Sequence, residues 1–170
     1  MIRPFRSQIM SLASSQWVAS HHNILITGPT GVGKSYLACA LCHSAIRQGH
    51  TALYRRASRL FDDLAAARAD GRYPRVLTTL ARVDILCIDD FGLSSLTDHQ
   101  PTDLLEILED RIDRRSTMVT SQLPTDAWHK LFPDPTFGDA ILDRLTHSAF
   151  SIPISGDSMR QHATPKEALS

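Results

Sequence analysis

The stretch GPTGVGKS at residues 28–35 indicates the fold of this chain more strongly than any other part of it. It matches the pattern G-x-x-x-x-G-K-[ST], the P-loop that holds the phosphates of a nucleotide. The short run Asn23–Thr27 before it is apolar at its centre and is typical of a buried strand. The segment Tyr36–Arg47 after it is rich in Ala and Leu and lacks Gly and Pro, which predicts a helix. We therefore interpret the stretch as a phosphate-binding loop rather than a glycine-rich turn that binds nothing.

The chemistry of this loop points to ATP and Mg²⁺. Its glycines let the backbone curl so that successive N–H groups point at anionic oxygens, and the helix N-terminus adds partial positive charge there. Lys34 can reach the β- and γ-phosphates, and the Ser35 hydroxyl can bind Mg²⁺. The residues expected to contact the nucleotide are Gly28, Pro29, Thr30, Gly31, Val32, Gly33, Lys34, Ser35 and Tyr36.

A second pattern supports the first. The apolar run Val83–Ile88 ends in two acids, Asp89 and Asp90, as a Walker B strand does. In P-loop ATPases the first acid helps to hold Mg²⁺, and a second acid can act as general base on the attacking water. The alternative is a strand that ends in a polar turn. The P-loop upstream favours the Walker B interpretation, because both strand ends must then converge on one metal ion.

Composition excludes several classes of protein. The chain has 170 residues, enough for one domain with a real core, and its 18 basic residues balance 18 acidic ones, so bulk charge does not indicate a nucleic-acid partner. No apolar run approaches the roughly 20 residues of a membrane span, and no signal peptide is visible, so we expect a cytoplasmic protein without a membrane partner. Cys39, Cys42 and His43 spell the haem pattern C-x-x-C-H, but inside a predicted helix we interpret them as packing residues.

The rest of the chain alternates between predicted strands and helices. Further strands are expected at 51–55, 116–120 and 150–154, and helical segments at 8–18, 58–69, 75–82, 96–114, 125–131 and 138–147. This order predicts an α/β fold of the P-loop NTPase class, a three-layer α/β/α sandwich around a five-stranded parallel sheet. The ligand should lie at the carboxyl ends of the strands, where Gly28, Asp89 and Gln122 fall. Trp17 could line an adenine pocket, but we favour a core position.

We divide the chain into a helical lead-in at 1–22, an ATPase domain at 23–160 and a disordered tail at 161–170. One stretch of the domain is basic and could neutralise DNA phosphates or form a solvated helix face, and its composition leaves both interpretations open. Its arginines are Arg55, Arg56, Arg59, Arg68, Arg72, Arg75 and Arg82.

Several blocks together, in order from about residue 8 to residue 160, show that the chain resembles the IstB-like transposition helper ATPases, relatives of the DnaC helicase loader in the AAA+ class. The P-loop alone does not separate families, but the later blocks do. The blocks are 23–38, 69–71, 88–93, 114–117, 120–124, 140–145 and 156–160.

The resemblance implies roles for individual residues. Lys34 and Ser35 look like the Walker A pair, Asp89 like the Mg²⁺ ligand and Asp90 like the catalytic acid, which is Glu in many relatives. Gln122 is at the sensor position, where its amide could orient the attacking water.

Two arginines have implied roles as well. Arg144 is similar to an arginine finger that acts on ATP held by a neighbouring subunit, which can raise turnover on the order of 10³-fold or more. The alternative for Arg144 is a surface ion pair with Asp143. Arg160 is a candidate for a second sensor.

The resemblance also implies partners: double-stranded DNA, a transposase, and further copies of the chain with ATP at their interfaces. It favours DNA contact by the basic stretch Arg55–Arg82. Family members usually carry an additional N-terminal domain, whereas the first predicted strand here begins at Asn23. We therefore expect ATP binding to persist, with assembly and transposase stimulation more sensitive to that difference. The alternatives are a helicase loader, a small-molecule kinase, and a nucleotide-binding remnant without turnover.

Overall fold

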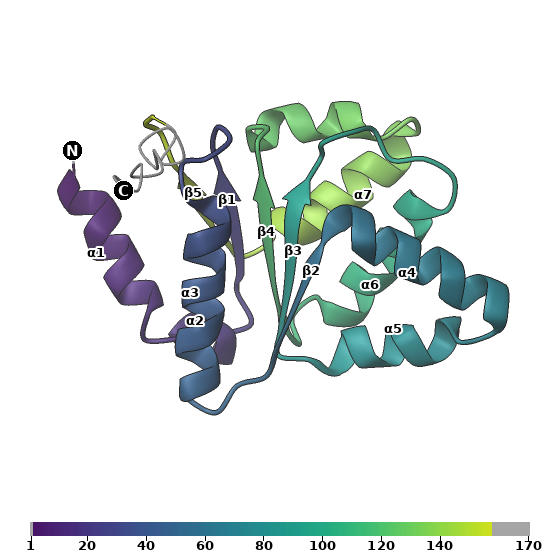
Figure 1. The fold of residues 1–170 in the computed structure, drawn as a ribbon, viewed down its shortest axis with the longest axis horizontal. Helices are drawn as coiled ribbons and strands as arrows, with labels where there is room; N and C mark the ends of the chain where they lie inside the picture. Colours follow the sequence, from purple (N-terminus) through teal and green to yellow (C-terminus); the bar gives the residue numbers. More distant parts are fainter. Residues whose placement is uncertain (1, 158–170) are drawn as a thin grey trace, which may run out of the picture.

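A parallel β-sheet forms the centre of the molecule in the computed structural model, which describes residues 2–157 (Figure 1). The strands lie side by side in the order β2-β3-β4-β1-β5, and every neighbouring pair is parallel. The predicted α/β architecture with a five-stranded parallel sheet is therefore confirmed. The strands are β1 Asn23–Thr27, β2 Ala52–Arg56, β3 Ile85–Phe91, β4 Ser116–Ser121 and β5 Ala149–Pro153.

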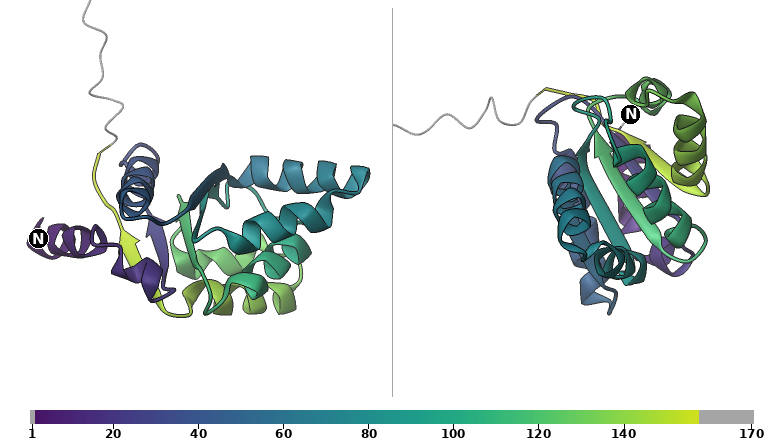
Figure 2. Two further views of the ribbon diagram at one scale, coloured as in Figure 1. Left: turned by 90° about the horizontal axis from the view of Figure 1, so that it is seen from below. Right: turned by 90° about the vertical axis from the view of Figure 1, so that its right-hand side faces the viewer.

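Helices connect the strands and cover both faces of the sheet, as the turned views in Figure 2 show. Figure 1 shows α1, α2 and α3 at the β1–β5 end of the molecule, and α4 to α7 at the β2–β3 end. The helices are α1 Ile2–Leu12, α2 Gln16–Ala19, α3 Lys34–Arg47, α4 Ala57–Asp70, α5 Tyr73–Arg82, α6 Gln100–Arg111, the 3₁₀ helix η1 Thr125–Leu131 and α7 Pro135–Thr146. Within residues 2–157, no helix has the length and apolar character that crossing a lipid bilayer requires.

Alternating side chains of the strands build two separate cores, one on each face. In β1, Ile24 and Ile26 belong to the core under α2 and α3, whereas Leu25 belongs to the core under α4, α5, α6, η1 and α7. Successive side chains of a strand point to opposite faces, so apolar residues throughout a strand bury it on both sides. Trp17 is 3% exposed in the first core, where its indole donates to the carbonyl of Leu12 at 3.0 Å, and the core interpretation of Trp17 is confirmed.

The predicted helical segment at 8–18 is wrong in its bounds, because the chain forms two helices there, α1 and α2, with Ser15 between them at a positive φ of 60°. Two further helices differ from their predicted bounds for local reasons. The predicted helix at 96–114 is shorter as α6, because the amide of Leu96 donates to the carbonyl of Leu131 and Asp113 has a positive φ of 57°. The predicted helix at 138–147 begins earlier as α7, where the Asp134 side chain accepts the amide of Thr136 at 2.9 Å. Side-chain capping of this kind satisfies a helix N–H that has no partner within the helix.

The carboxyl ends of the strands meet along the upper edge of the sheet in Figure 1, and the amino ends along the lower edge. At the upper edge, the backbone of Gly28 passes so close to the carbonyl of Ile154 that a Cβ atom would collide with it. Only glycine fits at this position, and the P-loop therefore starts directly against the segment that follows β5.

Candidate nucleotide-binding site

The P-loop connects β1 to the N-terminus of α3. Gly33 precedes the helix with a φ of 101°, a left-handed conformation that glycine adopts without a steric penalty. This turn directs the first N–H groups of α3 into the loop, where they can bind an anion. Lys34 is 6% exposed, and its ammonium group donates to the carbonyl of Pro29 at 2.8 Å across the loop. Lys34 is therefore held at the place where phosphates would contact the loop.

Asp89 is fixed by hydroxyl groups from three elements. It is 2% exposed, and the Ser35 hydroxyl of α3 lies 2.9 Å from each of its carboxylate oxygens. The hydroxyls of Tyr54 on β2 and Thr120 on β4 also donate to it. Burial alone would raise the pKa of Asp89, but the hydrogen bonds from Thr120, Tyr54 and Ser35 lower it below its usual value. Asp89 is therefore held as a carboxylate directly beside Ser35.

Asp90 is next in sequence but differs in environment. Its φ of 56° is unusual for a residue other than glycine and interrupts the register between β3 and β4. The Asp90 amide donates to the Thr120 hydroxyl at 3.0 Å, which holds this backbone conformation. Its side chain is partly exposed and forms an ion pair with Arg56 at 3.1 Å. The backbone turn thus points the second acid away from the sheet, toward an exposed arginine.

A cleft of about 680 Å³ contains both acids and the P-loop. Tyr36 borders it with 82% of its side chain exposed, which leaves the ring available for a ligand. Gln122 lines the cleft as well, so the structure brings the sensor candidate to the same place as the two acids. The lining residues are Thr30, Gly31, Gly33, Lys34, Ser35, Tyr36, Tyr54, Arg56, Asp89, Asp90, Leu93 and Gln122.

The donor set of this cleft fits magnesium. Mg²⁺ is usually bound by one or two protein oxygens together with phosphate oxygens and water. The Ser35 hydroxyl and the Asp89 carboxylate already touch and could supply the protein ligands. Among residues 2–157 there is no cluster of three or more His, Cys, Asp or Glu side chains that could hold a metal without such help. A metal ion here would therefore depend on the phosphates of a bound nucleotide.

Three residues that line the cleft were not predicted from the sequence: Tyr54, Arg56 and Leu93. Thr120, whose hydroxyl donates to Asp89, was not predicted either. A signal for two of them was present, because Tyr54 lies in the strand predicted at 51–55 before the Walker B strand, and Arg56 directly follows it. In the sheet, Arg56 is paired in register with Asp89. The missing information was which strand lies beside β3, and that is a property of the topology.

The arginine-finger candidate lies outside this cleft. Arg144 is on α7, where it pairs with Glu109 at 2.9 Å and with Asp143 at 3.7 Å. The ion pair between Arg144 and Asp143, the alternative interpretation from the sequence, is present, but Glu109 of α6 is the closer partner. Arg160, the candidate for a second sensor, and the predicted tail at 161–170 lie outside the described residues.

The basic stretch Arg55–Arg82 is less available than its composition indicates. Four of its arginines pair with carboxylates: Arg55 with Asp63, Arg56 with Asp90, Arg68 with Asp103 and Arg72 with Asp70. Arg59, Arg75 and Arg82 have no carboxylate within 4.0 Å among residues 2–157. A DNA contact in this stretch would therefore depend mainly on these three.

Comparison with known proteins supports the nucleotide site and the fold. The model of the family described as IstB-like ATP binding protein matches residues 5–167. Two insertion sequence ATP-binding proteins of Sinorhizobium fredii are 52% and 48% identical to the chain, over 95% and 92% of its length. The chain spans 66% and 63% of the lengths of these two relatives.

Among solved structures, the crystal structure of the DnaC helicase loader superposes with a TM-score of 0.76. The match covers 87% of this chain and 86% of that one, at 19% sequence identity. At that identity the likeness concerns the fold alone, and it agrees with the predicted α/β fold around a parallel sheet.

Proposed function

Because the chain belongs to the family of IstB-like ATP binding proteins, we propose that it hydrolyses ATP with Mg²⁺ as a helper protein of insertion-sequence transposition. The observation that carries this proposal is the convergence of Ser35, Asp89 and Asp90 in one cleft beside the P-loop. A site that only stored a nucleotide would need the P-loop but not the second acid, which contributes nothing to the contact between Ser35 and Asp89.

The residues of the cleft have different roles in the proposed reaction. The P-loop amides and Lys34 bind the phosphates through charge-assisted hydrogen bonds. Ser35 and Asp89 would hold Mg²⁺, which supplies positive charge to the phosphate oxygens as the bond to the leaving group breaks. Tyr54 and Thr120 keep the Asp89 carboxylate in one orientation by donating to it. This preorganisation lowers the reorganisation needed when the metal binds.

Asp90 would take the proton from the attacking water, and Gln122 would orient that water. In the structure the Asp90 carboxylate is held by Arg56, so it must turn from Arg56 toward the water before it can act. The ion pair is exposed on the Arg56 side, where such pairs are worth about 0 to 1 kcal/mol. The turn therefore costs little free energy, and Arg56 becomes available to a phosphate of the nucleotide.

Arg144 would act on ATP held by a neighbouring copy of the chain. It lies outside its own cleft and would exchange Glu109 for a phosphate oxygen of the neighbour's nucleotide. This proposal requires a homo-oligomer with ATP at the subunit interfaces. Duplex DNA is the proposed surface for assembly and a transposase the proposed partner. The printed names of the relatives, insertion sequence ATP-binding proteins, support that setting. The likeness to a helicase loader concerns the fold and gives no reason to prefer that function.

The test is ATP hydrolysis with and without long duplex DNA, measured over a range of protein concentrations. We expect DNA to stimulate turnover cooperatively in protein concentration. Lys34→Ala should lose nucleotide binding and turnover, whereas Arg144→Ala should bind nucleotide and lose the stimulated turnover. Nucleotide binding without turnover at any concentration of protein and DNA would contradict the hydrolytic part of the proposal and favour a nucleotide-binding remnant.

A second arm of the experiment tests the alternative of a small-molecule kinase. A kinase transfers the γ-phosphate to an acceptor and does not need an acid that activates water. Turnover that survives Asp90→Asn in the presence of an acceptor would favour it.

A further inference from the structure

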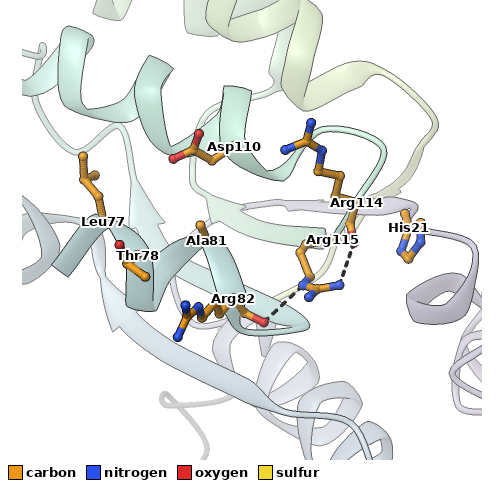
Figure 3. A pocket seen from close by; sticks show the side chains of 8 residues that line it. All are labelled: His21, Leu77, Thr78, Ala81, Arg82, Asp110, Arg114 and Arg115. Carbon is orange, nitrogen blue, oxygen red and sulfur yellow. Dashed lines mark hydrogen bonds between the residues drawn. The ribbon is translucent and has the colours of Figure 1, made fainter. Parts of the chain in front are cut away.

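The lower edge of the sheet, opposite the nucleotide cleft, carries an arginine-lined cleft. We propose that this cleft binds the phosphate backbone of duplex DNA, an inference that rests on the DNA partner in the proposed function and names the surface for it. Its volume is about 600 Å³. Figure 3 shows that the lining comes from the end of α5, from the end of α6 with the loop after it, and from His21. The lining residues are His21, Leu77, Thr78, Ala81, Arg82, Asp110, Arg114 and Arg115.

The three lining arginines lack carboxylate partners. Among residues 2–157, no carboxylate lies within 4.0 Å of Arg82, Arg114 or Arg115. The cleft includes one acid, Asp110. Because the whole chain is neutral in formal charge, this local excess of positive charge does not follow from a basic composition. The cleft is therefore a positive region on a balanced protein.

A competing explanation is that these arginines only neutralise helix ends. The C-terminus of a helix carries partial negative charge, and α5 and α6 both end here. That charge already has donors, however. The buried Arg111 donates to the carbonyls of Leu80 at 2.6 Å and Val83 at 2.8 Å. Arg115 donates to the carbonyls of Arg82 and Arg114, each at 3.1 Å (Figure 3). These carbonyl groups therefore already have donors, namely the guanidinium groups of Arg111 and Arg115.

The remaining two guanidinium groups, those of Arg82 and Arg114, make no hydrogen bond or ion pair within residues 2–157, and both side chains are exposed. Arg82 is on α5 and Arg114 is on the loop after α6. They therefore present positive charge to solvent from two elements of the same cleft. Their positions are fixed by Arg111 and Arg115, which tie the ends of both elements together.

The arrangement fits an extended polyanion better than a single small anion. Arg75, also exposed and without a carboxylate within 4.0 Å in the described chain, precedes Arg82 by two helical turns of α5. Seven residues of an α-helix rise roughly 10.5 Å, so positive charge continues along α5 beyond the cleft. A nucleic-acid backbone offers a row of phosphates to such a row of cations, and arginine binds phosphates without reading sequence. The surface therefore predicts DNA binding without sequence preference.

The experiment is a binding titration of the full chain with a long labelled duplex, followed by fluorescence anisotropy between about 50 and 200 mM salt. The double variant Arg82→Gln/Arg114→Gln removes two exposed guanidinium groups that make no hydrogen bond or ion pair in the described chain. The matched control Arg6→Gln/Arg47→Gln removes the same charge from α1 and α3, where both arginines are also exposed and have no carboxylate within 4.0 Å in the described chain. Binding of a fluorescent ATP analogue checks that each variant is folded and keeps its nucleotide cleft.

We expect the Arg82→Gln/Arg114→Gln variant to bind DNA at least about tenfold more weakly, with the slope of log K against log salt smaller by about 1.8, which corresponds to two lost phosphate contacts. The control variant should bind within about twofold of the unaltered chain, and ATP-analogue binding should be unchanged in both. Equal DNA affinity of the two variants and the unaltered chain, or a larger loss in the control, would overturn this surface while leaving the proposed DNA partner intact. Failure of the unaltered chain to bind duplex DNA would instead overturn the DNA part of the proposed function, and this surface with it.

Discussion

The two edges of the sheet use charged side chains in opposite ways. At the carboxyl edge, the acid Asp89 is buried and held by three hydroxyl donors. At the amino edge, the base Arg111 is 1% exposed and held by carbonyl groups and the Thr117 hydroxyl, with no carboxylate within 4.0 Å in the described chain. Burial and the nearby charge of Arg115 lower the pKa of Arg111, while Asp84 opposes them. One edge therefore fixes a negative charge and the other a positive one.

This difference shows what each edge can attract. Asp89 beside Ser35 would attract a metal ion in the proposed function, and the P-loop amides next to it would attract phosphates, so the carboxyl edge fits a metal-bound nucleotide. The amino edge instead presents the guanidinium groups of the arginine-lined cleft, and this positive charge fits a phosphate backbone. The two edges lie at opposite ends of the same strands. Substitutions at one edge can therefore be tested for effects on ligand binding at the other.

Among substitutions that test the difference between the two edges, we expect the largest effect on stability, from replacing the buried Arg111. Arg111→Met should lower the free energy of unfolding by about 3 kcal/mol, because several carbonyls between α5 and β4 would be buried without a donor. Urea denaturation measures this. The exposed Arg114→Met, whose side chain makes no hydrogen bond in the described chain, is the control and should change the free energy by less than about 0.5 kcal/mol. Similar values for the two variants would show that Arg111 does not organise the amino edge.

An intermediate effect, on metal-dependent nucleotide binding, is expected for Thr120. Its hydroxyl accepts a hydrogen bond from the Asp90 amide and donates one to the Asp89 carboxylate. Thr120→Val keeps the size of the side chain but leaves the Asp90 amide without its acceptor and Asp89 with one donor fewer. We expect the Mg²⁺ concentration for half-maximal nucleotide binding to rise by about tenfold, in line with the loss of a contact outside the metal's direct ligands. Thr120→Ser restores the hydroxyl and should recover most of the affinity; equal behaviour of Val and Ser would contradict the role.

The smallest effect is expected at Asp84, at the amino edge. The Thr51 amide is the main cause that lowers the pKa of Asp84; burial opposes it, and the Thr51 hydroxyl and the charge of Arg115 add to it. A carboxyl with a lowered pKa in the folded state stabilises the fold above its unfolded pKa, about 3.9, and loses that contribution as pH falls through the folded value. Asp84→Asn should therefore cost less than about 1 kcal/mol at neutral pH. The free energy of unfolding of Asp84→Asn and of the unaltered chain, measured at pH 7 and at about pH 2, checks whether the difference disappears once Asp84 is protonated in the folded state as well.

The sequence predicted the carboxyl edge far better than the amino edge, for a physical reason. The P-loop and the two acids belong to short continuous patterns, and the parallel topology alone places Gly28, Asp89 and Gln122 at one edge. Tyr54 and Thr120 join the site through strand order and register, which no local pattern contains.

The arginine-lined cleft shows the same limit more strongly. Arg82 lies within the predicted basic stretch, but Arg114 and Arg115 are more than thirty residues away along the chain. Counting the arginines of the basic stretch also overestimates the positive charge that is available to a ligand. Carboxylates on other elements, such as Asp90 and Asp103, pair with some of these arginines. Composition counts charges, whereas only tertiary structure shows which of them are already paired.

The central claim is that Asp89 and Asp90 have separate roles, and Asp90→Asn tests it most directly. ATP binding with Mg²⁺ and steady-state hydrolysis should be measured on the same preparation, with duplex DNA present. We predict that binding stays within about threefold of the unaltered chain, while turnover falls by at least about 10², as expected for loss of a general base. Turnover within a few fold of the unaltered chain would contradict the account, because Asp90 would then do no more than pair with Arg56.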